Sequence, residues 1–537
     1  MRIERLPWPI VATSITLLVA ISGWSPAAAQ KQGGTLRLYH NDTPASASLL
    51  EEATISTVAP FAALFNNLVV FDNSKPHESM DTIVPDLAES WSWDDTNTRL
   101  TFKLRQGVKW HDGQPFTAKD VQCTWRMLIG KSEGPTDFRK NPRKIWYSKL
   151  LDVTTSGDYE ATFILSEPQP SLPVLLASGY SVVFPCHVSQ QEMRTKPIGT
   201  GPFKLADYKR GESIRLVRNP DYWKKGRPYV DEITYKVIDS RSTRLLAFET
   251  GEFDITFPND VSIPLTKEVK AQDPQAICQT LPTGTAGNLL VNRVNPPFDN
   301  PDIRTAMSLA LDRQEFSQIF QEGQALMGGA MLPKPSGEWG MPPEVLATLT
   351  GYGPDHAKSL ADAQAIMTKL GYGDSNPLKI KIQTRNLVTY RDPAVVLIDQ
   401  LKKIHIQSEL DVIDTTQWYP RLIRRDYTIG FNVTGISVDD PDGNLIENYA
   451  CKSERNYTQY CNADVDKLLA AQSRELDKDK RKKMVWDIER ILVEDGARPI
   501  IDFGVATNCW QPYVKGYVPH DNSQYNNLRY EDVWLDK

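Results

Sequence analysis

A histidine and an aspartate stand side by side at His111 and Asp112, and these two residue types are common in general acid–base catalysis and in metal binding. The flanking residues favour a structural interpretation. Apolar and charged residues alternate over residues 102–105, as in a half-buried strand, and Asp112-Gly113 is a turn signal. Thr117–Asp120 predicts the capped start of a helix. We therefore expect the pair at the tip of a hairpin that leads into a helix.

Other sequence motifs for catalysis, phosphate binding or metal binding are absent or incomplete. The sequence contains no HExxH, GxSxG or GxGxxG, and the Gly130–Ser132 stretch has Trp125 where a phosphate loop needs glycine. The acidic run Asp439–Asn444 resembles part of a calcium loop, but Val438 and Tyr449 would occupy its first and last ligand positions. The sequence therefore predicts no catalytic residues, no metal site and no cofactor, and a secreted hydrolase is the weakest of the functions considered.

The first residues predict export. Arg2 and Arg5 precede an apolar run over Ile10–Ile21, and small residues allow a cut after Ala29. This is the secretory signal pattern, and the run is too short to span a bilayer. The first cysteine is Cys123, so lipid attachment at the cut is not expected. We predict a signal peptide over residues 1–29 and a mature periplasmic protein that is not a lipoprotein.

Length and charge narrow the function classes. A chain of 537 residues implies roughly two to four domains or lobes. The formal net charge of −6 argues against nucleic acid or an anionic membrane as a partner. Export permits disulfides, and the six cysteines contain no CxxC pair that would indicate a redox motif.

Strand-like and helix-like segments alternate along the whole chain, which indicates an α/β protein. Strands are expected at Gly34–His40, Glu212–Asn219 and Glu232–Ile238. Helices are expected at Asn300–Phe320, Tyr390–Ile404, Val465–Leu476 and Asp477–Gly496.

An ordered set of segments resembles one family, the extracytoplasmic solute-binding proteins of peptide-type ABC transporters (dipeptide, oligopeptide and nickel binders). The segments are Pro85–Trp91, Leu100–Val121, Gly199–Leu205, Ile214–Ile233, Arg244–Ile255, Pro296–Arg313 and Cys461–Gln472. The resemblance implies a two-lobed α/β periplasmic binding protein fold with three domains and a cleft that closes by a hinge. It implies domain I at 30–77, 198–294 and 505–537, domain II at 78–197, and domain III at 295–504.

The same resemblance implies site residues, and one of them departs from the family pattern. In the peptide binders an aspartate four residues before a proline holds the ligand's ammonium group. Here that position, counted from Pro441, is Ser437. A hydroxyl cannot neutralise a buried ammonium. Asp439 or Asp440 would have to substitute if the loop is shifted; otherwise the ligand lacks a free amino terminus.

The resemblance implies four further sets of site residues, two of them with a structural alternative. Trp418 matches a pocket tryptophan, with core packing as the alternative. Arg385 is a candidate partner for a ligand carboxylate, with a solvated arginine as the alternative. Asn288 is expected near the cleft, and Val433 and Gly435 would contribute backbone groups.

The resemblance also implies a disulfide between Cys451 and Cys461. The states of Cys123, Cys186, Cys278 and Cys509 stay open, with burial as free thiols as the default expectation.

The function implied is a monomeric receptor without enzymatic activity. It would capture a peptide or peptide-like solute and deliver it to an inner-membrane ABC permease with its ATPase subunits. A nickel or metal-chelate receptor and an oligosaccharide or opine-type binder are the alternatives on the same fold.

Overall fold

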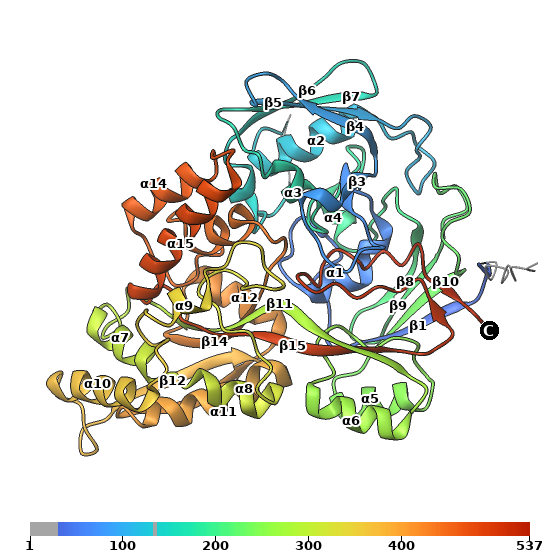
Figure 1. Ribbon diagram of the computed structural model, residues 1–537. Helices are drawn as coiled ribbons and strands as arrows, with labels where there is room; N and C mark the ends of the chain where they lie inside the picture. The colour runs from blue at the N-terminus through green and yellow to red at the C-terminus, as the bar shows by residue number, and fades with distance from the viewer. Residues whose placement is uncertain (1–29, 133–136) are drawn as a thin grey trace, which may run out of the picture.

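The computed structural model describes residues 30–132 and 137–537 (Figure 1). The signal peptide expected at residues 1–29 therefore lies outside the described residues. The chain forms two lobes joined by two long strands, β11 (Ile277–Val291) and β15 (Ile500–Trp510), which cross the lower part of the view in Figure 1. Within the described residues, no helix combines the length and the apolar character that a membrane crossing requires.

The first lobe contains two four-stranded sheets. One has the order β1-β10-β9-β8, and only its β1–β10 pair is parallel. The other is fully antiparallel, in the order β4-β5-β7-β6, and α2 packs against it. The strand bounds are β1 Thr35–His40, β4 Ala88–Trp93, β5 Arg99–Leu104, β6 Leu150–Thr155, β7 Glu160–Leu165, β8 Phe203–Lys209, β9 Ser213–Arg218 and β10 Glu232–Val237.

Six α-helices, one of them the α2 already mentioned, and two short strand pairs belong to the described part of this lobe. The helices are α1 Ile55–Phe61, α2 Ala118–Ile129, α3 Leu172–Ala177, α4 Gln190–Met193, α5 Arg241–Glu249 and α6 Ile263–Gln272. The short pairs are β2 Val69–Phe71 with β3 Ile83–Pro85, and β16 Val514–Lys515 with β17 Trp534–Leu535.

The hairpin and helix expected around His111 are present, and the histidine has a structural role. Thr117 and Asp120 form a capping box at the start of α2. Gly199 N donates to His111 Nδ1 at 3.1 Å, and His111 Nε2 lies 3.1 Å from the Gly201 carbonyl oxygen. Burial lowers the pKa of His111 to about 4, so the ring is neutral and ties the hairpin to the 199–201 loop.

The second lobe is built on a mixed five-stranded sheet in the order β13-β12-β14-β11-β15. Strands β12 (Leu378–Arg385), β13 (Ile406–Ile413) and β14 (Ile429–Gly435) are parallel, and β11 runs antiparallel to both of its neighbours. The helices are α7 Pro301–Ala310, α8 Arg313–Gln321, α9 Pro343–Leu346, α10 His356–Lys369, α11 Val388–Lys402, α12 Thr415–Arg424, α13 Glu447–Tyr449, α14 Ala463–Gln472 and α15 Lys478–Glu494.

The predicted bounds of one helix are wrong. The single helix predicted over 300–320 is two helices, α7 and α8, because Leu311 is extended at φ −69° and ψ 108°. Asp312 then caps α8 by accepting from Glu315 N at 2.9 Å. The apolar period continues across this break, so the periodicity alone did not reveal it.

Three disulfides join all six cysteines. The expected pair, Cys451 with Cys461, is confirmed. The default expectation of free thiols for the other four is wrong, because Cys123 pairs with Cys186 and Cys278 pairs with Cys509. The last pair links β11 to β15, where Cys278 faces Cys509 in the register of the two strands.

Each lobe has its own large apolar core. One large core holds side chains of both first-lobe sheets together with residues after β15, such as Tyr525 and Leu535. A second core lies around β12, β14, α7 and α11. The two sheets of the first lobe share a single core, so the boundary between domains I and II proposed from the sequence is not marked by separate cores.

Candidate functional site

The carboxyl ends of the parallel strands in the second lobe face the first lobe. Arg385 ends β12, and Gly435 ends β14. In open α/β sheets, ligands bind in the crevice outside the carboxyl ends of the strands. Here that crevice is closed by first-lobe residues: Asp42 and Ser56 contact Arg385, and Tyr525 packs on Gly435.

A cavity of about 450 Å³ lies beside these strand ends and is lined by residues of both lobes. This volume is within the range of about 300–1,000 Å³ that small-molecule sites occupy. Its walls come from α1, the segment before α6, β11, α8, α11 and β15. Most of its lining is apolar, including Ile55, Phe257, Leu265, Phe316, Phe320, Val388 and Phe431.

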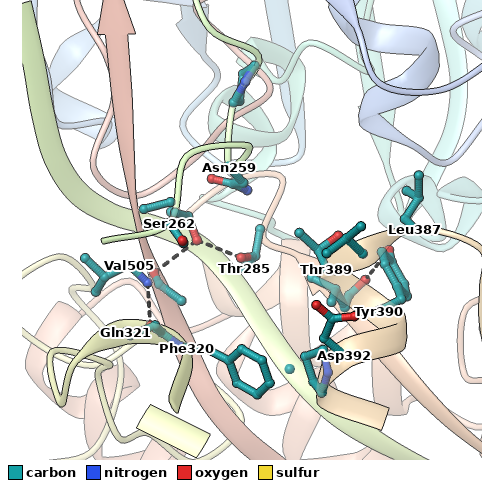
Figure 2. Close-up of a pocket in the computed structure, with 18 of the residues that line it drawn as sticks. Asn259, Ser262, Thr285, Phe320, Gln321, Leu387, Thr389, Tyr390, Asp392 and Val505 are labelled. Atoms are coloured by element: carbon teal, nitrogen blue, oxygen red, sulfur yellow. Dashed lines mark hydrogen bonds between the residues drawn. The ribbon is translucent and has the colours of Figure 1, made fainter. Parts of the chain in front are cut away.

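Polar groups stand on opposite walls of this cavity (Figure 2). On the β11 side, the Thr283 and Thr285 hydroxyls are 2.6 Å apart. On the α11 side, the Tyr390 hydroxyl donates to the Val433 carbonyl oxygen at 3.2 Å. Val433, for which the sequence predicts a backbone contact with the ligand, lines the cavity, and its carbonyl oxygen is occupied by Tyr390 in this structure.

Asp502 is the buried carboxyl group of the cavity. Gln321 Nε2 donates to its Oδ2 at 2.8 Å, and Gln321 Oε1 accepts from Val505 N at 2.7 Å. These two bonds hold the Gln321 amide in one orientation. Burial raises the pKa of Asp502 to about 6, so this carboxyl group is ionised at neutral pH.

Arg385 lines the cavity but its guanidinium is already engaged. Nε donates to the Thr415 hydroxyl at 2.8 Å, and Nη2 donates to the Ser56 hydroxyl at 2.8 Å and to the Asp42 carboxylate. Ser56 Oγ in turn donates to Asp42 at 2.8 Å. The arginine proposed for a ligand carboxylate thus holds the lobes together in this structure.

Ser437 lies at the lobe interface and is 1 % exposed. Its hydroxyl accepts from Arg143 Nε at 3.3 Å, and its carbonyl oxygen accepts from Asn526 Nδ2 at 3.1 Å. Both partners belong to the first lobe. Ser437, the residue that departs from the family pattern expected from the sequence, therefore faces a buried cation.

The aspartates that follow Ser437 are used inside the second lobe. Asp439 Oδ2 accepts from Glu338 N at 2.8 Å, and burial raises the pKa of Asp439 to about 8. Asp440 accepts two bonds from Arg481 at 2.7 and 2.8 Å. Asp440 is consequently neutralised by its own arginine, and Asp439 is uncharged at neutral pH.

The remaining expected residues fall on both sides of β14. Trp418 is completely buried and donates from Nε1 to Asn432 Oδ1 at 3.1 Å. It packs in the interior of the second lobe and does not line the cavity. Asn288 is buried on the same face, where its Nδ2 donates to Thr434 Oγ1 at 2.9 Å. A Cβ on Gly435 would collide with the Tyr525 hydroxyl, so this glycine permits close approach of the lobes.

Several cavity residues were not found from the sequence, among them Asn259, Ser262, Thr285, Gln321 and Asp502. They come from segments far apart in the chain, and no spacing pattern joins them. The first-lobe partners Asp42 and Arg143 were missed for the same reason. Across residues 30–132 and 137–537, no group of three or more His, Cys, Asp or Glu residues is arranged to hold a metal ion.

Comparisons with a family model and with known protein sequences point to the same group of proteins. Residues 82–456 match the family model described as bacterial extracellular solute-binding proteins, family 5 Middle. The probable di/tripeptide-binding protein 5 of Pseudomonas aeruginosa is 25 % identical over 520 residues, which is 92 % of this chain and 94 % of that protein. The oligopeptide-binding protein AppA of Bacillus subtilis is 27 % identical over 478 residues, 84 % of this chain and 83 % of its own.

Solved structures share the fold at lower identity. DppA from Helicobacter pylori in complex with the peptide STSA has a TM-score of 0.81 at 22 % identity, covering 94 % of this chain and 99 % of that one. AgaA from A. tumefaciens R10 in complex with agropinic acid has a TM-score of 0.81 at 22 % identity, with the same coverage. The two-lobed fold expected from the sequence is confirmed by these similarities.

Proposed function

Because this chain belongs to family 5 of the bacterial extracellular solute-binding proteins, we propose that it is the receptor subunit of an ABC importer. In this role it captures a peptide or peptide-like small solute between its lobes and delivers the solute to a membrane permease. Binding occurs without chemical turnover. The closed, solute-loaded form is the one that the permease recognises.

The cavity between the lobes is the observation that carries this proposal. It has a volume of about 450 Å³ and takes side chains from both lobes and from the two connecting strands. Opening of the lobes would take the walls apart, so entry and release of a solute are coupled to hinge motion. Relatives named as di/tripeptide-binding and oligopeptide-binding proteins support a peptide-like solute.

The location and the partners follow from the same proposal. The receptor is exported to the periplasm, is cut after Ala29, and acts as a monomer beside a permease and its ATPase subunits. A relative from Haemophilus influenzae named as a periplasmic oligopeptide-binding protein supports this location. N-terminal sequencing of the exported protein should begin at Gln30; an acylated or uncut product would contradict this part. The three-domain division, with domain II at 78–197, belongs to the proposal as well.

A second candidate is an opine-type solute. The similar structure of AgaA holds agropinic acid, and Ser437 stands where the peptide binders have an acid. A nickel or metal-chelate ligand has less support, because the described cavity lining contains no histidine or cysteine.

Native mass spectrometry of protein purified from its own host, combined with small-angle scattering, tests the proposal. A bound solute should be retained at a one-to-one ratio, and its removal should increase the radius of gyration. The exposed Lys236–Glu252 pair, joined at 3.1 Å within the first lobe, gives a control: Lys236→Gln should bind and close as the wild type does. Conversion of the bound solute to a product, or an unchanged radius on loading, would reject the receptor function.

A further inference from the structure

Two arginines share one carboxylate just beyond the carboxyl end of β14. Arg143 Nε from the first lobe lies 3.4 Å from Glu447 Oε2, and Arg455 Nε from the second lobe lies 2.5 Å from Glu447 Oε1. All three side chains are at most 5 % exposed. The Ser437 hydroxyl contacts the same Arg143.

The donors of this cluster are not fully used. Nε and Nη1 of Arg455 are buried without a hydrogen bond, and the Arg455–Glu447 contact is short but does not have hydrogen-bond geometry. The Tyr180 hydroxyl, whose ring packs on Arg143 at 3.4 Å from the guanidinium carbon, is also buried without a partner. Buried donors of this kind cost free energy unless something accepts from them.

The cluster also has an excess of positive charge. Arg498 lies nearby with three neutral acceptors, Asn288, Asn448 and Thr434. Burial lowers the pKa of Arg498, and the charge of Arg455 lowers it further. Arg143 and Arg455 therefore share the single carboxylate of Glu447, and Arg498 adds a third buried arginine without an acidic partner of its own.

The surrounding tyrosines do not supply the missing negative charge. Burial raises the pKa values of Tyr180, Tyr457 and Tyr525, so these hydroxyls stay neutral. Asp42 is bound to Arg385, and Asp440 is bound to Arg481. An uncompensated charge in a buried site is unfavourable.

We infer that this cluster is a binding subsite for a carboxylate of the solute, held between Arg143 and Arg455 with the Tyr180 hydroxyl as a further donor. The inference rests on the proposed receptor function and specifies its ligand class. Guanidinium groups match the planar geometry of a carboxylate and can donate two parallel hydrogen bonds to it. The solute is thus an organic acid at this end, in contrast to the ammonium end that an acid at position 437 would select.

A row of packed tyrosine side chains separates the subsite from the cavity, so a solute that spans both must enter while the lobes are apart. Tyr390 lines the cavity, and its hydroxyl is 3.5 Å from that of Tyr419. The Tyr419 ring packs on Tyr457, and the Arg455 guanidinium lies 5.8 Å from the Tyr457 ring centre. The apolar part of the solute then occupies the cavity while its carboxylate enters the arginine subsite.

Three matched probes test the charge preference: N-acetyl-Ala-Leu, its neutral C-terminal amide, and the cationic Ala-Leu-amide. Calorimetry should show the carboxylate probe binding at least tenfold more tightly than either of the others, which corresponds to about 1.4 kcal/mol at 25 °C. Arg455→Met should remove this difference, and Arg455→Lys should restore part of it because the charge returns. Arg474→Met, which alters an exposed arginine at the same lobe boundary, should leave the difference intact.

A measurement on the solute-free protein keeps the inference testable if none of these probes binds. Arg455→Met should raise the melting temperature of the empty protein, because a buried charge in excess is removed; Arg474→Met should not. A lower melting temperature for Arg455→Met would show that the arginine is structural and would overturn the subsite. Equal binding of the three probes with lobe closure would also overturn it, while leaving the receptor function intact. Absence of lobe closure with the host-derived solute would instead reject the receptor function.

Discussion

Arg385, at the end of β12, donates to the carboxylate of Asp42 in the other lobe, and both side chains are largely withdrawn from solvent. The pair is supported by Ser56, which bonds to both residues. Removing one member of a buried ion pair leaves an uncompensated charge and costs about 3–5 kcal/mol. This contact exists only while the lobes are together, so its free energy contributes to closure.

Asp42→Asn distinguishes closure from ligand binding as the role of Arg385. If the pair stabilises the closed form, this substitution should weaken solute binding at least tenfold and increase the radius of gyration of the loaded protein. Calorimetry and small-angle scattering measure the two effects. Tighter binding in Asp42→Asn would show that Arg385 serves a ligand carboxylate once Asp42 no longer competes for it.

Gly435→Ala should impair closure while leaving each lobe folded. The added Cβ would collide with the Tyr525 hydroxyl of the opposite lobe, so the solute affinity should fall at least tenfold. The melting temperature of the empty protein should change little. Gly373→Ala is the matched control, since a Cβ at Gly373 meets nothing within 4 Å. Wild-type affinity in Gly435→Ala would show that the lobes do not approach this closely when loaded.

Asp439 should make the protein less stable as the pH rises. Burial, followed by the charges of Asp440, Glu338 and Glu78, raises its pKa from 3.8 to about 8. The folded protein then keeps a proton that the unfolded chain releases. The stabilisation is full below pH 3.8 and is lost as the pH rises to about 8, with a slope of about 1.4 kcal/mol per pH unit.

Asp439→Asn should therefore flatten the dependence of the free energy of unfolding on pH between about 4 and 8. Urea titrations at several pH values measure this slope. Glu489, whose pKa burial also raises to about 8, leaves a residual slope in the variant. Asp374→Asn, at a fully exposed side chain, should retain the wild-type slope. An unchanged slope in Asp439→Asn would contradict a neutral Asp439.

The Cys278–Cys509 disulfide should contribute more to stability than Cys451–Cys461. The two pairs close segments of 231 and 10 residues, and longer closed loops restrict the unfolded chain more. Replacing Cys278 and Cys509 by serine should cost about 2–5 kcal/mol, measured by chemical denaturation. The corresponding double variant at 451 and 461 should lose less. Non-reducing peptide mapping should recover all three pairs, and the detection of a free thiol would contradict the pairing.

Local signals in the sequence correctly predicted the hairpin before α2, the capping by Thr117 and Asp120, and the strands β1, β9 and β10. These features depend on neighbours a few residues apart, which short-range patterns report. The break at Leu311 was missed because the apolar period runs through it.

The site was harder to predict because its contacts are long-range. Arg143 and Ser437 are 294 residues apart in the chain, and Asp42 and Arg385 are 343 apart. No periodicity or spacing rule connects such positions. Ser437 was recognised as unusual from its place before Pro441, but the cation that faces it emerged only from the fold.

The pairing of β11 with β15 has a consequence for how the chain acquires its structure. Cys278 meets Cys509 across these strands, and side chains as late as Val533 and Leu535 belong to the core of the first lobe. A chain delivered from its amino terminus therefore lacks part of the first lobe until its last residues arrive. The second lobe, whose core lies between residues 289 and 501, has all of its own core residues earlier. Folding order and sequence order thus diverge: the lobe that begins first in the sequence is completed last.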